Sequence, residues 1–159
     1  MIDRIPTEKD WDQYKSEDLK DDIDVMEFEH SKKRFLGKSN DEILSWFEDG
    51  GSIGTGEDIE NMTRVPFRYY IFGYQKYILS EVPLKIEDSD AASCYLNLFL
   101  TVLQKNPEYL RPIMQELYPS IEYVAENQMK FDATIDIYGD FKEKLEKIRQ
   151  LCEEMNFHI

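Results

Sequence analysis

The chain has 159 residues, a formal net charge of −14 at pH 7 and a pI near 4.5. Its 42% hydrophobic residues suffice for a buried core in a domain of this length, which argues against global disorder despite 33% charged residues. The acidic balance argues against non-specific nucleic-acid binding, which needs basic surface, and is compatible with a basic partner or simply with high solubility.

The first thirty residues are strongly acidic, with four basic and eleven acidic side chains and a net charge of 4 − 11 = −7. They contain no apolar run of the kind that opens a signal peptide, and the whole chain has two cysteines, which favours the reducing cytoplasm. Ser16 can cap a helix whose thin apolar stripe is Leu19, Ile23 and Met26. A basic run and Gly37 indicate where that helix ends.

A second helix is predicted from the capping box that runs from Ser39 to Glu42, and it extends through Phe47. The glycine-rich stretch Gly50–Gly56 follows. It has a superficial likeness to a phosphate-binding loop, but it lacks the lysine and the preceding strand and leads into Glu57, so a flexible connection is favoured.

Two strongly apolar helices are predicted for the core, over residues 64–80 and 91–104. Pro66 suits the first turn of the earlier one, and the connection between them contains Pro83 and a cap region at residues 88–90. Their apolar stripes are Phe67, Tyr70, Ile71, Tyr74, Tyr77 and Ile78 in the first helix, and Ala92, Tyr95, Leu96, Phe99 and Leu103 in the second.

Proline and glycine divide the remaining sequence. Pro107 ends the second core helix, a short helix is expected around residues 108–117, and Pro119 restarts another. Gly139 indicates a break before an amphipathic last helix over residues 140–155.

These patterns predict an all-α fold, a single-domain bundle of about six or seven helices around the two apolar core helices. We expect residues 1–15 to be a loosely ordered acidic N-terminal segment and residues 16–159 to form the one helical domain.

Candidate chemistry is sparse. Asp132, Asp136 and Asp140 recur every four residues, a spacing that could hold Mg²⁺ on a continuous helix, but capping of the last helix by Asp140 is the simpler interpretation. Arg68 and Arg111 lie beside apolar sequence, and this aspartate group is one possible partner for them. No catalytic constellation, metal site or cofactor site is predicted, so we do not expect an enzyme.

The many tyrosines allow two interpretations. Tyr69, Tyr70, Tyr74 and Tyr77 could line a small-molecule or catalytic pocket together with Arg68 or Arg111, or they could simply pack with their hydroxyls reaching polar groups. Packing is the default.

The strongest candidate for a binding surface is a stretch of seven acidic residues without one basic residue. An acidic surface of this kind fits a cationic partner. An acidic mimic of nucleic acid is an alternative, although no motif supports it. The seven residues are Asp41, Glu42, Glu48, Asp49, Glu57, Asp58 and Glu60.

Four short segments resemble small bacterial proteins that look like immunity proteins of polymorphic or contact-dependent toxin systems. The segments are Phe35–Ser39, Val65–Tyr70, Asp88–Cys94 and Asp136–Phe141, and the likeness covers roughly residues 35–148. The resemblance implies a protein that binds and neutralises a cognate toxin and performs no catalysis.

Together with the charge, the resemblance predicts a cytoplasmic inhibitor whose partner is a basic protein toxin, with a nuclease as one candidate. We expect no direct binding of nucleic acid and no membrane association.

Overall fold

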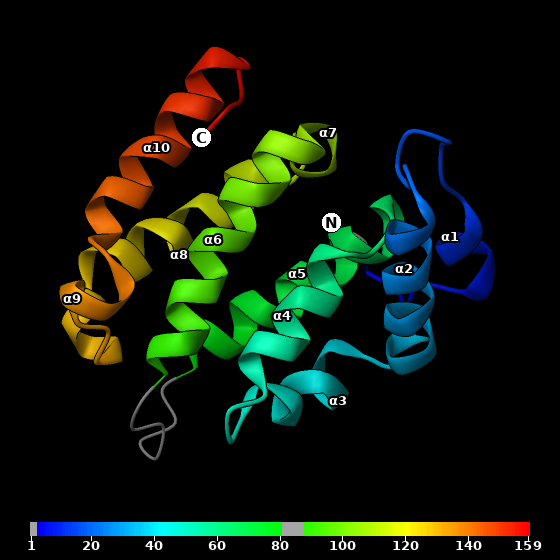
Figure 1. Ribbon diagram of the computed structural model, residues 1–159, viewed down its shortest axis with the longest axis horizontal. Coiled ribbons are helices and arrows are strands. Elements are labelled where there is room, and N and C mark those ends of the chain that lie inside the picture. Colours follow the sequence, from blue (N-terminus) through cyan, green and yellow to red (C-terminus); the bar gives the residue numbers. More distant parts are fainter. Residues whose placement is uncertain (1–2, 81–87) are drawn as a thin grey trace.

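The computed structural model describes residues 3–80 and 88–159 of the chain (Figure 1). Within these residues it is entirely helical, with ten α-helices, two 3₁₀ helices and no strand. The all-α class is therefore confirmed, but the expected six or seven helices are too few. The helices that the sequence does not predict are α1 (Glu8–Asp12), α4 (Ser52–Glu60) and α9 (Ile135–Tyr138), and the first and last of these are too short to show an apolar period. Two other short helices, α3 (Asn40–Ile43) and α7 (Pro107–Leu110), lie where helices are predicted.

Helix α5 (Arg64–Leu79) is the element around which the others pack. It contacts α1, α3, α4, α6, α7 and α8, and nine of its 16 residues are buried. Pro66 lies in its first turn, where the missing N–H removes no helical hydrogen bond. The predicted apolar stripe is confirmed as core, since each of its members is at most 4% exposed.

Helix α6 (Ser89–Lys105) is the second core element, as predicted. It packs between α4 (Ser52–Glu60) and α10 (Phe141–Glu154), and Figure 1 shows this arrangement. Helix α8 (Met114–Glu126) contacts α5, α6 and α10 and completes the core. The amphipathic pattern of the last helix is confirmed, with its buried face formed by Phe141, Leu145, Ile148 and Cys152.

The N-terminal residues pack onto this core. Thr7 caps α1, because its hydroxyl accepts a backbone N–H of the first turn. Trp11 is fully buried, with ring centroids 6.1 Å from Phe28 and 6.0 Å from Tyr70. Residues 8–12, which lie in the segment that the sequence predicts to be loosely ordered, thus form a helix in contact with α5.

Helix α2 (Asp22–Phe35) begins later than predicted, with Asp21 rather than Ser16 as its cap. The expected apolar stripe is wrong, because Ile23 and Met26 are 66% and 67% exposed. The side chains on the opposite face of the helix pack inward instead. This inner face consists of Phe28, Ser31 and Phe35.

The capping box at the start of α3 is confirmed. The Ser39 hydroxyl accepts the Glu42 backbone N–H at 3.1 Å, and the Glu42 carboxylate accepts the Ser39 backbone N–H at 3.1 Å. A 3₁₀ helix, Leu44–Phe47, follows directly, so the predicted helix through Phe47 is formed in two pieces.

The expected flexible connection at Gly50–Gly56 is wrong, because α4 begins at Ser52. Tertiary packing accounts for the helix. Thr55 and Ile59 are fully buried, and a Cβ at Gly56 would lie only 3.2 Å from a ring carbon of Tyr74. The glycine permits this close approach, and burial offsets its poor intrinsic helix propensity.

Proline and glycine have different effects in the last third of the chain. The expected restart at Pro119 is wrong, since α8 runs through this residue from Met114 to Glu126. The break at Gly139 is confirmed by its φ of 76°. Asp140 caps α10 by accepting the Lys142 backbone N–H at 2.9 Å, as the simpler interpretation predicts.

Among the helices of the described residues, none has the length and apolar character needed to cross a bilayer. The predicted connection through Pro83 lies outside the described residues. Cys94 and Cys152 are free thiols, the first half-buried and the second buried.

Candidate functional site

The seven acidic residues of the predicted binding surface lie in three neighbouring elements of the chain. Their surroundings divide them into internal, paired and free carboxylates. Helix α3 carries Asp41 and Glu42, the turn after the 3₁₀ helix carries Glu48 and Asp49, and α4 carries Glu57, Asp58 and Glu60.

Asp58 is internal and does not belong to an open surface. Its side chain is 8% exposed, and the guanidinium of Arg34 donates to it at 2.7 Å while His30 Nε2 lies 3.5 Å away. Arg34 also donates to the Thr55 hydroxyl at 3.1 Å and stacks on the Trp46 ring, 4.6 Å from its centroid. A buried carboxylate needs such partners, so Asp58 serves to join α2 to α4.

Three further acids of the stretch have intramolecular contacts. Asp41 forms an exposed ion pair with Lys76. The Ser39 backbone N–H lowers the pKa of Glu42, consistent with its place in the capping box. Glu60 is half-buried, and burial raises the pKa of its carboxyl while a hydrogen bond from Thr101 acts in the opposite direction.

Glu48, Asp49 and Glu57 are the free acids of the stretch. All three are exposed, and their carboxylates make no hydrogen bond or ion pair with the residues that the structure describes. Ile53, which is 46% exposed, lies one helical turn before Glu57 on the same face of α4. We call Glu48, Asp49, Ile53 and Glu57 the α4 acidic surface.

Asp88 extends the negative charge beside this surface. The Tyr77 hydroxyl donates to the Asp88 carboxylate at 2.8 Å. Burial is the main cause that raises the pKa of Tyr77, and the hydrogen bond to Asp88 and the charges of Asp88, Glu48 and Asp49 add to it. Sequence reasoning assigned Asp88 only to the cap region of α6, yet its side chain makes no cap hydrogen bond.

Tyr70 and Tyr74 pack in the core, and their hydroxyls are bound to backbone carbonyls. The Tyr74 hydroxyl donates to the Ala91 carbonyl at 2.6 Å. The Tyr70 hydroxyl lies 2.8 Å from the Phe35 carbonyl and 2.7 Å from that of Lys38, so its proton is shared between two backbone acceptors. Both rings are fully buried, and burial raises the pKa of both hydroxyls.

The two arginines also have partners, but not the expected ones. Arg68 donates to the backbone carbonyls of Tyr109 at 2.9 Å and Glu108 at 2.6 Å, and Arg111 donates to the Glu108 carboxylate at 3.0 Å. The suggested pairing with the Asp132–Asp140 group is therefore wrong. Within the described ranges, no group of three His, Cys, Asp or Glu residues could hold a metal ion.

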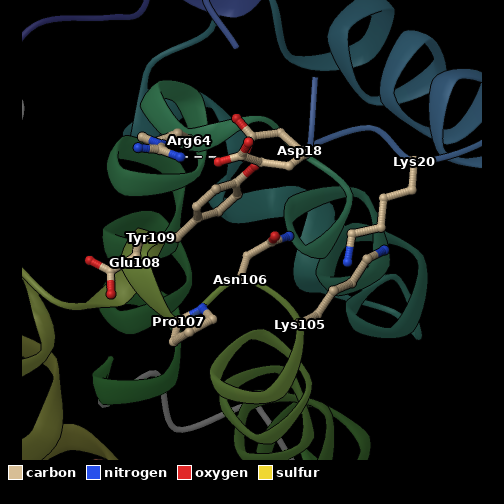
Figure 2. A pocket seen from close by; sticks show the side chains of 9 residues that line it. Asp18, Lys20, Arg64, Lys105, Asn106, Pro107, Glu108 and Tyr109 are labelled. Atoms are coloured by element: carbon tan, nitrogen blue, oxygen red, sulfur yellow. Dashed lines mark hydrogen bonds and ion pairs between the residues drawn. The ribbon is translucent and has the colours of Figure 1, made fainter. Parts of the chain in front are cut away.

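A cleft of about 200 Å³ lies between the segment before α2, the start of α5 and the α6–α7 junction. Figure 2 shows the side chain of Asn106 near its centre, with Lys20 and Lys105 on one side and Asp18 and Tyr109 on the other. Asp18 is only 5% exposed and Tyr109 only 2%, so the latter side is a fixed wall.

The charges of this cleft balance one another. Three basic side chains (Lys20, Arg64, Lys105) and three acidic ones (Glu17, Asp18, Glu108) line it. Arg64 donates to Asp18 at 3.4 Å, and Lys105 donates to Asp24 outside the lining at the same distance. The cleft therefore favours neither an anion nor a cation. Sequence reasoning missed it because Asp18 and Arg64 are 46 residues apart.

No family model, curated protein or solved structure was found to match the chain. The resemblance to immunity proteins accordingly stays a prediction.

The structure brings the four segments of that resemblance together in two pairs. Tyr70 of the second segment donates to the Phe35 carbonyl of the first, and Tyr138 of the fourth donates to Asp90 of the third at 2.8 Å. These contacts give the segments a structural role in joining helices.

Proposed function

We propose that the chain is a single-domain helical bundle of the immunity type, which binds and neutralises a basic protein toxin in the cytoplasm. A nuclease is one candidate for the toxin, because an enzyme that handles nucleic acid needs a basic surface. The role is binding without catalysis, and it requires no cofactor, membrane or nucleic acid. The observation that carries the proposal is the set of free carboxylates of Glu48, Asp49 and Glu57.

The α4 acidic surface suits an inhibitor for two physical reasons. Glu57 stands on a helix whose other face is fixed in the core by Thr55 and Ile59, and Glu48 and Asp49 lie in the short turn before that helix, so binding orders little further backbone. The net charge of −14 would steer a basic partner toward the protein and accelerate association at low salt.

The rival hypotheses have less support. A tyrosine-lined pocket would need free hydroxyls, but those of Tyr70 and Tyr74 are bound to backbone carbonyls. Arg68 is likewise engaged by two carbonyls. A nucleic-acid mimic would share the charge of the protein, but no described feature favours it over a protein inhibitor.

The test begins with the tagged protein as bait in a lysate of the native host at low salt, eluted stepwise with rising salt. Bound proteins are identified by mass spectrometry, and one basic protein in near-equal amount is purified for kinetics and for an assay of its toxicity. The triple variant E48Q/D49N/E57Q should then associate several-fold more slowly, with a flatter dependence on salt.

The matched control is E143Q/E153Q/E154Q, which removes the same charge from exposed positions of α10. It should retain the association rate of the wild type more closely. Equal effects of the two triples would show that only the overall charge matters. Absence of a stoichiometric basic partner, or a partner whose activity the protein leaves unchanged, would refute the inhibitor function.

A further inference from the structure

Helix α9 and the 3₁₀ helix before it (Gln128–Phe131) expose an unusual amount of apolar side chain. Met129 is 64% exposed, Ile135 57% and Ile137 76%. None of the four residues of α9 is buried, and only Tyr138 turns toward the core, where its hydroxyl donates to Asp90 at 2.8 Å. Figure 1 shows α9 at the edge of the molecule, next to the start of α10.

The segment that presents these side chains is held firmly. The buried side chain of Gln128 donates to the carbonyls of Ala133 at 2.8 Å and Gly139 at 2.7 Å, and it accepts the Phe141 backbone N–H at 2.9 Å. The side-chain amide of Gln128 thus binds the backbone on both sides of α9. The apolar residues are displayed by a fixed backbone, and their exposure is not the fraying of a chain end.

The charge around this apolar area is acidic. Asp132 and Asp136 are exposed, and their carboxylates make no hydrogen bond or ion pair with the described residues. Two nearby cations have partners of their own: Lys130 donates to the Tyr123 hydroxyl at 2.6 Å and lies 5.2 Å from the centroid of that ring, and Lys144, beside Gly139, donates to the Ser93 hydroxyl at 3.4 Å. Asp136 lies between Ile135 and Ile137 in the sequence, so an unpaired negative charge accompanies the two isoleucines.

We infer that this area is a docking surface for the apolar face of a basic amphipathic helix of a partner protein. We call it the α9 surface, and it consists of Met129, Asp132, Ile135, Asp136 and Ile137. Such a helix would cover the exposed side chains with apolar residues and place its lysines or arginines beside the two aspartates. This inference goes beyond the proposed function, because it concerns another surface and holds whether or not the partner is a toxin.

An exposed apolar area could also bind a second copy of the chain or a membrane, and the charge of the α9 surface argues against both. A second copy of the chain would bring Asp132 and Asp136 against the same residues of its neighbour, and like charges in close contact oppose association. An anionic membrane surface would be repelled by the same carboxylates. A basic amphipathic helix would cover the exposed apolar side chains and also neutralise the two carboxylates.

Three fluorescent synthetic peptides of about four helical turns each provide the probe. The first is an amphipathic helix of leucine and lysine, the second replaces lysine by glutamate, and the third replaces leucine by serine. Only the leucine–lysine peptide should bind the full chain in fluorescence anisotropy. The variant I135S/I137S should weaken this binding at least about tenfold.

The matched control is I23S/M26S, which removes equally exposed apolar side chains from α2 and should leave peptide affinity unchanged. A second variant, D132N/D136N, should weaken binding and flatten its salt dependence. Asparagine tolerates the left-handed backbone of position 132, so this variant retains the fold. The toxin experiment with E48Q/D49N/E57Q tests the α4 acidic surface alone. If that variant binds a toxin as fast as the wild type does, the proposed function fails, but the expected peptide results do not change.

Several results would overturn the inference. Equal binding of the serine–lysine peptide would mean that charge alone acts, and equal losses in I135S/I137S and I23S/M26S would place binding elsewhere. A wild-type dimer in sedimentation that I135S/I137S converts to monomer would make a second copy the occupant. Binding of the wild type, but not of I135S/I137S, to phosphatidylglycerol vesicles would make it a membrane.

Discussion

Replacing Gly73 by alanine should destabilise the protein, although alanine is the better helix former by about 1 kcal/mol. Gly73 lies within α5 where α3 packs against it. An added Cβ would overlap the Asn40 side-chain oxygen and lie 2.9 Å from both Asn40 Cγ and Ile43 Cδ1. Asn40 cannot move away without weakening its hydrogen bond to the Tyr69 carbonyl at 3.0 Å, and Ile43 is fully buried.

The expected size follows from these contacts. Overpacking typically costs about 1–3 kcal/mol, loss of the Asn40 hydrogen bond adds about 1 kcal/mol, and the helix propensity of alanine returns about 1 kcal/mol. The free energy of unfolding should therefore fall by about 1–3 kcal/mol. A change of 1 kcal/mol shifts the thermal midpoint by roughly 2–4 °C in a domain of this size, so the midpoint should fall by several degrees.

Gly54 provides the control within the same protein. It lies on the exposed side of α4, and nothing would lie within 4 Å of an added Cβ. Gly54→Ala should therefore raise the free energy of unfolding by about 0.5–1 kcal/mol. Urea unfolding followed by circular dichroism compares both variants with the wild type. A Gly73→Ala variant as stable as the wild type, or more stable, would refute the close packing of α3 on α5.

Two further predictions concern titration. The Arg4 guanidinium and the Thr7 backbone N–H hold the pKa of Asp10 well below its usual range. The ionised carboxylate therefore stabilises the fold above the unfolded pKa of about 3.9, and this stabilisation is lost as the pH falls further. In urea titrations, Asp10→Asn should therefore lose less stability than the wild type between about pH 5 and pH 2. Burial raises the pKa of Cys152 to about 11, and the side chain is 0% exposed. In a C94S background, Ellman's reagent at pH 8 should label it far more slowly in the folded than in the urea-unfolded protein, and equal rates would contradict its burial.

Local signals predicted much of the fold. The apolar stripe of α5 is confirmed because it repeats over nearly the whole helix, and the pattern of α10 is equally regular. The capping box at Ser39 and the break at Gly139 depend on neighbouring residues alone, so they can be recognised without knowledge of the tertiary structure. Capping of α10 by Asp140 could be predicted for the same reason, because it depends on neighbouring residues alone.

The errors have a common physical origin in long-range packing. Helix α4 forms although two glycines precede it and two lie within it, because Gly56 fits beneath Tyr74. Asp58 lies among acids that the sequence places on one surface, yet Arg34, 24 residues earlier, draws it inward. For the candidate surface, composition identified the acidic stretch, but only burial and pairing separate its free carboxylates from those with structural roles.

The contact between Trp11 and α5 has a consequence for biosynthesis. The Thr63 hydroxyl donates to the Trp11 carbonyl at 2.9 Å across 52 residues of chain. At roughly 5–20 residues per second, a ribosome adds that length in roughly 3–10 s. During this interval the indole of Trp11 lacks much of its final environment, because Tyr70 lies beyond Thr63. The nascent N-terminus therefore remains exposed to chaperones and proteases until α5 has emerged, and α1 cannot complete its packing before α5 has been made.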